Sequence, residues 1–337
     1  MSKVSLLGAG SWGTALAIVL ANNGHDVILW SALEAEITML QTHREHMNRL
    51  PGVKLPDNIK VTSDLEMACS DPDIIVFSVA SPYVRSTAKQ CAPFIKEGQI
   101  IVNVGKGIEE DTLMTLSEIL QEELPKGEIT VLSGPSHAEE VSKGIPTTVV
   151  VGAKKKRTAE FIQNVFMNKV FRVYISPDII SIELGGALKN VIALAAGMVD
   201  GLGFGDNTKA ALMTRGIAEI TRLGVAMGGK KETLCGLSGI GDLIVTCTSN
   251  HSRNHNAGYL MGKGYSMEAA MEEVKQVVEG VYSAKSARKL AEKYQVNMPI
   301  IEAVNQVLFE EKSAEDATSE LLTRDRVAEY PELEWSE

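Results

Sequence analysis

The chain has few cysteines and no excess of basic residues. Four cysteines in 337 residues, none closely paired, predict a reducing compartment rather than a disulfide framework. The formal net charge of −10 argues against a nucleic-acid partner or an anionic membrane surface, because both require basic surface. The same field would repel a phosphorylated substrate. A site for one must therefore contain its own cluster of Lys and Arg.

The sequence also lacks a long hydrophobic run. It has no apolar stretch of the roughly 18 residues that a membrane-spanning helix needs, so we expect no membrane insertion. Met1-Ser2-Lys3 leads directly into a short apolar stretch, so we expect no signal peptide and a cytoplasmic location. With 45% hydrophobic residues, a chain of this length is expected to form two domains.

The first half alternates short β-branched runs with helical segments at 13–23 and 112–124. Uninterrupted apolar runs are typical of a parallel sheet that is covered on both faces. The pattern predicts a Rossmann-type, doubly wound α/β domain. Its predicted strands are 4–7, 27–30, 74–79, 100–104, 129–132 and 147–151.

The pattern changes near Ser176 and Pro177, which are typical of an N-cap followed by the first residue of a helix. This helix is expected to run to about residue 199, and it is apolar nearly all round, so it should lie at the centre of the packing. We therefore predict a dinucleotide-binding domain at 1–176 and an all-helical substrate domain at 177–337. Further helices are predicted at 207–227, 267–275, 283–294, 299–309 and 314–322.

Gly8, Gly10 and Gly13 form a G-x-G-x-x-G motif between the first strand and the first helix. In this context Gly8 permits a tight turn, Gly10 lets the backbone approach a pyrophosphate, and Gly13 lets the helix pack on the strand. The free N–H groups and the helix dipole then favour an anion. A purely structural glycine turn is the alternative.

The residues after the second strand leave NAD or NADP open as the cofactor. An acidic residue there would bind the ribose 2′-hydroxyl of NAD, but the chain has Ser31 and Ala32, with Glu34 slightly late. No Arg follows the strand to bind a 2′-phosphate. Arg49, in a later loop, is the basic residue that would reach it.

Further motifs are spread along the chain in a fixed order. They are Gly105-Lys106-Gly107, Ser133-Gly134-Pro135-Ser136-His137-Ala138, Leu188-Lys189-Asn190, Ser238-Gly239-Ile240-Gly241-Asp242-Leu243 and Ser252-Arg253-Asn254. Together with the glycine motif, they resemble the bacterial NAD(P)-dependent glycerol-3-phosphate dehydrogenases from Gly8 to Glu279. The chain departs from that family at Ser31-Ala32, where a basic residue is common, and at Arg49, where an aromatic is common.

The resemblance implies reversible hydride transfer between NAD(P)H and dihydroxyacetone phosphate, giving sn-glycerol 3-phosphate for phospholipid synthesis. It assigns Lys189 as the catalytic proton acceptor. The residues implied to bind substrate are Lys106, Gly134, Ser136, Lys189, Asp242, Ser252, Arg253 and Asn254. Those assigned to the cofactor are Gly8, Gly10, Ser11, Trp12, Gly13, Arg49, Lys106, Ala138, Arg253, Val277 and Glu279.

Physical chemistry agrees with the central roles. Burial of Lys189 on an apolar helix would lower its pKa, as a general base requires, although a lysine extending to the surface is the alternative. Arg253 offers a planar fork that suits a phosphate dianion. Lys106 follows a strand end, where α/β sheets bind ligands. Asp242 is expected as a helix N-cap, a role it could combine with accepting hydrogen bonds from substrate hydroxyls or Lys189. Thr246 and Asn190 are expected near the substrate carbonyl.

The sequence offers three alternatives. His251 and His255, with Cys235 and Cys247, suggest a metal, but the chain has no C-x-x-C and no acidic third ligand at helical spacing, so no metal is expected. A hydroxy-acid dehydrogenase of the same layout would use its arginine for a carboxylate. A nicotinamide-sensing protein would need no Lys189-Asn190 pair. A homodimer is the default oligomer.

Overall fold

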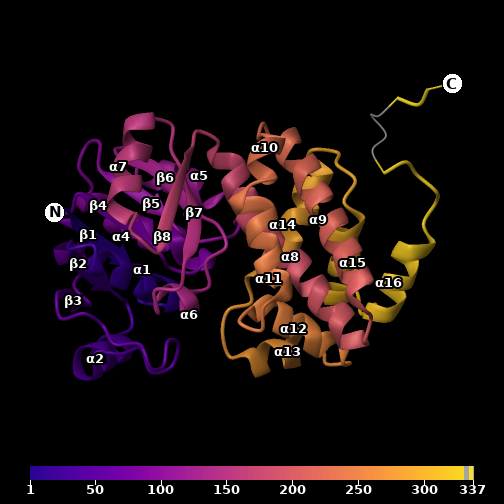
Figure 1. The fold of residues 1–337 in the computed structure, drawn as a ribbon, viewed down its shortest axis with the longest axis horizontal. Coiled ribbons are helices and arrows are strands. Elements are labelled where there is room, and N and C mark those ends of the chain that lie inside the picture. The colour runs from indigo at the N-terminus through magenta and orange to yellow at the C-terminus, as the bar shows by residue number, and fades with distance from the viewer. Residues whose placement is uncertain (330–333, 337) are drawn as a thin grey trace.

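The computed structural model describes residues 1–329 and 334–336. A region built on a sheet and a region built of helices lie side by side along the long axis (Figure 1). The described sheet has eight strands in the order β3-β2-β1-β4-β5-β6-β7-β8. These strands are β1 (Lys3–Leu7), β2 (Asp26–Trp30), β3 (Ile59–Thr62), β4 (Ile74–Phe77), β5 (Ile100–Asn103), β6 (Glu128–Ser133), β7 (Thr147–Gly152) and β8 (Phe171–Ser176).

Helices cover both faces of this sheet, because alternate strand residues point to opposite sides. Leu6 packs into one hydrophobic cluster and its neighbour Leu7 into another. The first cluster receives α1 (Ser11–Asn22), α2 (Glu34–His43), α6 (Ala138–Val141) and α7 (Lys156–Phe166). The residues of the second cluster come from α3 (Leu65–Cys69), α4 (Val84–Cys91), η2 (Ala92–Phe94) and α5 (Leu116–Glu123), and the short η1 (Ser81–Tyr83) leads into α4. The doubly wound α/β prediction is confirmed.

The sheet is parallel, as its apolar runs indicate, except at one pair of strands. β6 and β7 run antiparallel, with Leu132 opposite Val151. The connection between them holds only the short α6, which returns the chain to the same edge without the longer crossover that a parallel pair requires.

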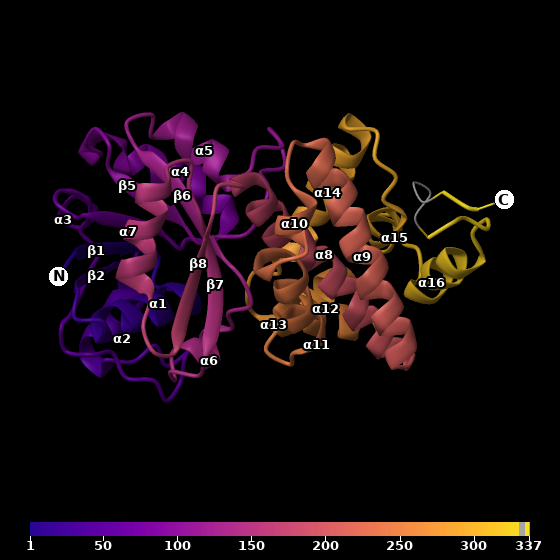
Figure 2. The same ribbon diagram turned by 45° about the horizontal axis from the view of Figure 1, so that its top comes forward.

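The helical region confirms the all-helical prediction for the second half of the chain (Figure 2). Its elements are α8 (Ile179–Leu202), α9 (Asp206–Ala226), α10 (Lys231–Leu234), the π-helical turn η3 (Leu237–Gly241), α11 (Asp242–Thr248), α12 (Arg253–Gly262), α13 (Met267–Val274), α14 (Glu279–Lys293), α15 (Pro299–Phe309) and α16 (Ala314–Thr323). The predicted N-cap is wrong. Ser176 ends β8, and the side chain of Asp178 caps α8 by accepting from Ser181 N at 3.2 Å.

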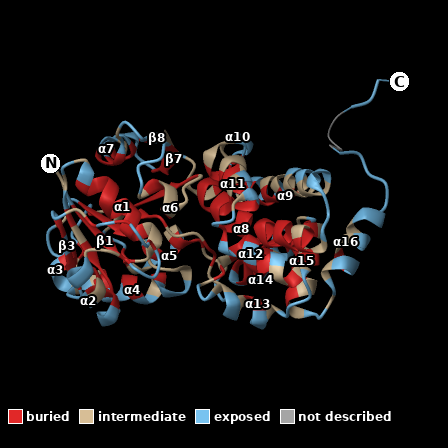
Figure 3. Ribbon diagram, turned by 60° about the horizontal axis from the view of Figure 1, so that its bottom comes forward, coloured by how far each residue is buried: buried red, intermediate tan, exposed pale blue. Residues whose placement is uncertain are grey.

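α8 lies at the centre of the helical region, as its composition predicts (Figure 3). It is the one described helix long and apolar enough to cross a membrane, but 89% of its most apolar window is buried inside the protein. α8 is therefore a core helix.

Glycines let α12 cross α8 at very short range. A Cβ on Gly197 would lie 2.0 Å from the carbonyl oxygen of His255, and one on Gly258 would lie 2.0 Å from that of Leu194. Only glycine fits at either position. This close packing brings the N-terminus of α12, with Arg253 at its first residue, towards the face of α8 that carries Lys189 and Asn190.

Candidate functional site

One cavity of about 660 Å³ opens between the sheet region and the helical region. Its sheet-side walls are the segments that follow β1, β4, β5 and β6, which is where α/β sheets bind ligands. Most of the residues that the sequence assigned to a site line it. They are Gly10, Ser11, Trp12, Arg49, Lys106, Ser136, Ala138, Lys189, Ser252, Arg253, Asn254 and Glu279.

The glycine loop has the geometry of a phosphate cradle. Gly8 has a φ of +115°, and a Cβ on Gly13 would lie 2.0 Å from the carbonyl oxygen of Gly8, so the helix start packs directly on the strand end. No side chain caps α1 at Gly10, which leaves the N–H groups of the first turn for an anion. A nicotinamide dinucleotide pyrophosphate fits this donor set.

Two lysines meet one buried aspartate beside the cavity. Lys189 donates to Asp242 Oδ1 at 2.6 Å, and Lys106 donates to Asp242 Oδ2 at 2.5 Å. Asp242 is 1% exposed and Lys189 is 6% exposed. Although burial opposes ionisation of Asp242, the two lysines hold its pKa below the usual value. Asp242 is the first residue of α11 and its carboxylate serves the lysines, so the N-cap interpretation is wrong.

Lys189 is buried, and its Nζ is held by polar partners. Burial lowers its pKa to about 8, against the opposing attraction of Asp242. Its Nζ also donates to Thr246 Oγ1 at 2.5 Å, and Thr246 in turn donates to the carbonyl oxygen of Asp242 at 2.6 Å. The side chain therefore points into the cluster, and the alternative of a lysine that extends to the surface is wrong.

The start of α12 carries the polar groups of the helical wall. Ser252 caps the helix by accepting from His255 N at 3.2 Å, and Arg253 is exposed to the cavity. Asn254 donates to Asn190 Oδ1 at 2.9 Å and accepts from Gly280 N at 2.8 Å. These bonds fix Asn190, the residue next to Lys189. Arginine and a helix N-terminus together favour an anion.

The remaining predicted residues lie around the cavity in different ways. The carbonyl oxygen of Gly134 accepts from Ser136 Oγ at 2.9 Å and from Lys106 Nζ at 3.4 Å, so Gly134 supports the wall without lining it. Val277 does not line the cavity, although its near neighbour Glu279 does. Glu279, at the start of α14, accepts from Ser81 Oγ at 2.5 Å and thereby joins the two regions.

The buried carboxylate that follows β2 belongs to Glu36, whereas Glu34 is exposed. Glu36 was not predicted from the sequence. Glu36 accepts from Ser31 Oγ at 2.5 Å, contacts His46 Nε2 at 3.0 Å and lies 3.7 Å from Arg49. Burial opposes ionisation, but these neighbours hold the pKa of Glu36 below its usual value. The carboxylate of Glu36 is used by these buried contacts, and its ion pair with Arg49 holds the guanidinium beside Gly10. Its spacing to Ser31 was the signal available in the sequence.

Two histidines complete the cavity wall. The rings of His137 and His251 lie with centroids 5.8 Å apart, and both residues line the cavity. His255, by contrast, contacts Asp200 Oδ2 at 2.8 Å. In the described part of the chain, no group of three or more His, Cys, Asp or Glu residues could hold a metal ion.

Comparison with known proteins identifies the family of this chain. The model of the NAD-dependent glycerol-3-phosphate dehydrogenase N-terminus matches residues 3–159, and that of the C-terminus of the same enzyme matches residues 178–319. The chain belongs to the glycerol-3-phosphate dehydrogenase family. As the two models together span most of the chain, both the sheet region and the helical region are family features.

Individual glycerol-3-phosphate dehydrogenases resemble the whole chain. The NAD(P)+ enzyme of Agathobacter rectalis is 63% identical over 99% of this chain and 100% of its own length. That of Bacillus subtilis is 52% identical over 99% of this chain and 97% of its own length. The crystal structure of the Coxiella burnetii enzyme superposes with a TM-score of 0.93 at 36% identity, covering 96% and 99% of the two chains.

Proposed function

We infer that this protein is an NAD(P)-dependent dehydrogenase that interconverts dihydroxyacetone phosphate and sn-glycerol 3-phosphate. Family membership supports the reaction. The observation that carries it in the structure is the Lys189–Asp242–Lys106 cluster, since both lysines line the same cavity as the phosphate cradle.

Lys189 is the proposed proton carrier. When the coenzyme is bound, it supplies the hydride, and the protein must provide a proton at the substrate oxygen. Protonated Lys189 holds that proton at Nζ in the reductive direction, and neutral Lys189 accepts one in the oxidative direction. Asp242 stabilises the charged form, and Thr246 accepts from Nζ and keeps the donor aligned.

The substrate phosphate is assigned to the start of α12. Arg253 would make paired charge-assisted bonds with it, and Ser252, Asn254 and Lys106 supply further donors around the same cavity. These residues form the local basic cluster that a chain of net charge −10 needs. Ser136 and Gly134 complete the proposed substrate site.

The coenzyme is assigned to the cradle at Gly8, Gly10 and Gly13, with Ser11 and Trp12 beside it. The further proposed contacts are Arg49, Lys106, Ala138, Arg253, Val277 and Glu279. Arg49, held by Glu36 beside Gly10, provides positive charge for an adenosine 2′-phosphate or for the pyrophosphate. Either NADP or NAD is therefore the proposed coenzyme, and no metal is assigned.

Purified protein mixed with dihydroxyacetone phosphate should oxidise NADPH or NADH, as followed by nicotinamide absorbance. Running both coenzymes in parallel measures the preference. Turnover with an oxo acid but none with dihydroxyacetone phosphate would replace this function by that of a hydroxy-acid dehydrogenase. Growth of a glycerol 3-phosphate auxotroph carrying the gene would test the proposed role in phospholipid synthesis.

The proposed assembly is a homodimer and the proposed compartment is the cytoplasm. A two-fold dimer is the commonest assembly of soluble proteins, which supports the proposed homodimer. All four cysteines are free, which suits a reducing compartment. Sedimentation equilibrium should return twice the chain mass if the protein is a homodimer.

The division into domains at 1–176 and 177–337 is also proposed, since the sheet ends at Ser176 and α8 begins at Ile179.

A further inference from the structure

The segment that carries Lys106 connects β5 to α5 and reaches towards the helical region. An antiparallel bridge between Ile108 and Thr115 closes it into a loop, which we call the Lys106 loop (residues 104–115). Lys106 stands near its start, where its Nζ meets Asp242 of α11. The geometry of the proposed substrate site therefore depends on how this loop is held against the helical region.

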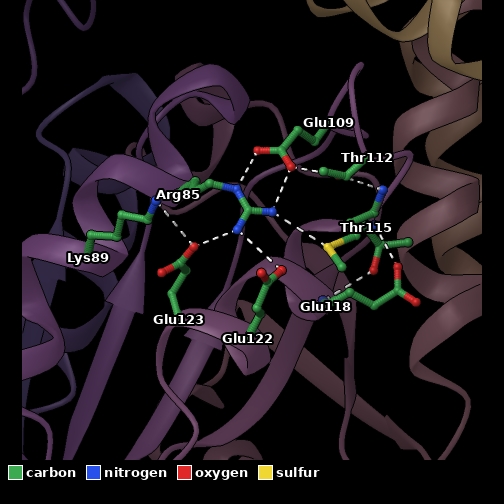
Figure 4. Close-up of polar contacts among 9 residues, drawn as sticks. Arg85, Lys89, Glu109, Thr112, Thr115, Glu118, Glu122 and Glu123 are labelled. Atoms are coloured by element: carbon green, nitrogen blue, oxygen red, sulfur yellow. Dashed lines mark hydrogen bonds and ion pairs between the residues drawn. The ribbon is translucent and has the colours of Figure 1, made fainter.

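Arg85 of α4 anchors the loop to the sheet region (Figure 4). Its guanidinium donates to both carboxylate oxygens of Glu109, at 2.8 and 2.7 Å. It also donates to Glu123 at 2.5 Å and to Glu122 at 3.2 Å on α5. This paired geometry fixes the outer part of the loop to the helix that follows it.

Contacts from α14 hold the loop from the helical side. Ser286 Oγ donates to the carbonyl oxygen of Ile108 at 3.3 Å, and Ser286 is fully buried. Lys289 lies 3.6 Å from the carboxylate of Glu110, and Lys285 lies 3.8 Å from it. The two ion pairs are half exposed and contribute little. The buried serine is the stronger of these contacts.

The buried anchor on the helical side is Glu183 of α8. Its carboxylate accepts from Ser117 N at 2.8 Å, from Ser117 Oγ at 2.5 Å and from Asn103 Nδ2 at 3.2 Å. Glu183 is 8% exposed, and no ion pair among the described residues includes it. Burial raises its pKa, so these donors are what stabilise the carboxylate.

The bonds of Glu183 grip both ends of the Lys106 loop. Ser117 lies in the first turn of α5, directly after the loop. Asn103 is the last residue of β5, directly before it, and its Oδ1 accepts from Gly105 N at 3.1 Å. One amide side chain therefore links Glu183 to the residue that precedes Lys106.

We propose that Glu183 is a positioning residue, which acts through Asn103 and Ser117 to hold the Lys106 loop against α8 so that Lys106 meets Asp242 and the substrate. It does not touch the substrate. The proposal rests on the proposed function only for its kinetic consequence. The mechanical grip on the loop is independent of which substrate binds.

The test compares Glu183→Gln with Glu219→Gln. Glutamine keeps the shape of Glu183 but replaces one carboxylate oxygen with an NH2 group. That group would face a hydrogen-bond donor of Ser117 or Asn103. Glu219 is the matched control, since it is a buried glutamate on α9 that accepts from Ile300 N at 2.8 Å and Ile301 N at 3.2 Å, entirely within the helical region. E183Q should lower kcat/KM for dihydroxyacetone phosphate about tenfold or more, because Lys106 is assigned to the substrate. E219Q should leave kcat/KM unchanged.

A double variant separates positioning from general destabilisation. If Glu183 acts through Lys106, adding E183Q to Lys106→Met should cost less than about twofold further, because coupled residues are not additive. Losses that multiply independently would overturn the proposal. Loss of stability alone, which would lower the melting temperature of E183Q and E219Q alike, would not make the effect of E183Q depend on Lys106.

Hydrogen exchange provides a readout that needs no turnover. Amides of residues 103–117 should exchange faster in E183Q than in the unmodified protein, and at an unchanged rate in E219Q. Unchanged exchange of this segment in E183Q overturns the grip, whatever the kinetics. An unmodified protein that turns over no dihydroxyacetone phosphate overturns the proposed function instead, and the exchange result then decides the role of Glu183 alone.

Discussion

Replacing Lys189 with methionine is expected to lower kcat for dihydroxyacetone phosphate reduction by about two to four orders of magnitude, the usual contribution of a positioned general acid. Methionine keeps the apolar stem that packs among the residues of α8 but removes Nζ, which donates to Asp242 and Thr246. The steady-state kcat measures the loss. Affinity for NADPH or NADH, measured by nicotinamide fluorescence, should be nearly unchanged because the phosphate cradle lies on other elements.

The pH profile identifies the group that is lost. The pKa of Lys189 is about 8, so its protonated form dominates below that pH and its neutral form above it. The rate of reduction, which needs the proton, should therefore fall as the pH rises through about 8. The rate of oxidation should rise over the same interval. Both transitions should be absent from the residual activity of K189M.

Lys209→Met is the matched control for that substitution. Lys209 also forms a close ion pair in the helical region, at 2.7 Å from Asp200, with its side chain 19% exposed. Removing it deletes one lysine and one ion pair without touching the cavity lining. Comparable loss of kcat in both variants, or an unshifted pH profile in K189M, would contradict the role of Lys189 as proton carrier.

The fold was predictable where strands are buried on both faces and not at the edges of the sheet. Edge strands β3 and β8 were missed because their residues alternate. Phe171 and Val173 are buried, whereas Arg172 and Tyr174 are exposed. The search for uninterrupted apolar runs finds only central strands. The antiparallel pairing of β6 and β7 was missed for a related reason, since apolar content carries no strand direction.

The site residues were predictable by motif, but their connections were not. Lys106, Lys189 and Asp242 lie on three different elements, and no local spacing reveals that one carboxylate joins both lysines. The buried Glu36 and Glu183 were missed for the same reason. A glutamate within a helix is expected to face solvent. Only tertiary contacts show that these two are buried.

Replacing Arg253 with glutamine is expected to raise KM for dihydroxyacetone phosphate about 100-fold or more, as loss of a charge-assisted pair with a dianion implies. Glutamine keeps a hydrogen-bond donor near the start of α12 but removes the charge, which no other arginine on the helical wall of the cavity replaces among the described residues. Because the chain as a whole carries a charge of −10, the local cation must offset a repulsive field. Initial rates over a range of substrate concentrations measure the change.

Dihydroxyacetone, which lacks the phosphate, separates this role from others. R253Q should leave the weak turnover of dihydroxyacetone nearly unchanged, since the charge acts on the phosphate and not on the carbonyl. Arg172→Gln changes the net charge equally at β8, where Arg172 stacks on Tyr174 at 5.2 Å, and should leave KM unchanged. An equal loss of activity with both substrates would indicate that Arg253 acts on the coenzyme or the reacting centre rather than on the substrate phosphate. An effect of R172Q as large as that of R253Q would show that the overall field, rather than a local bond, governs substrate binding.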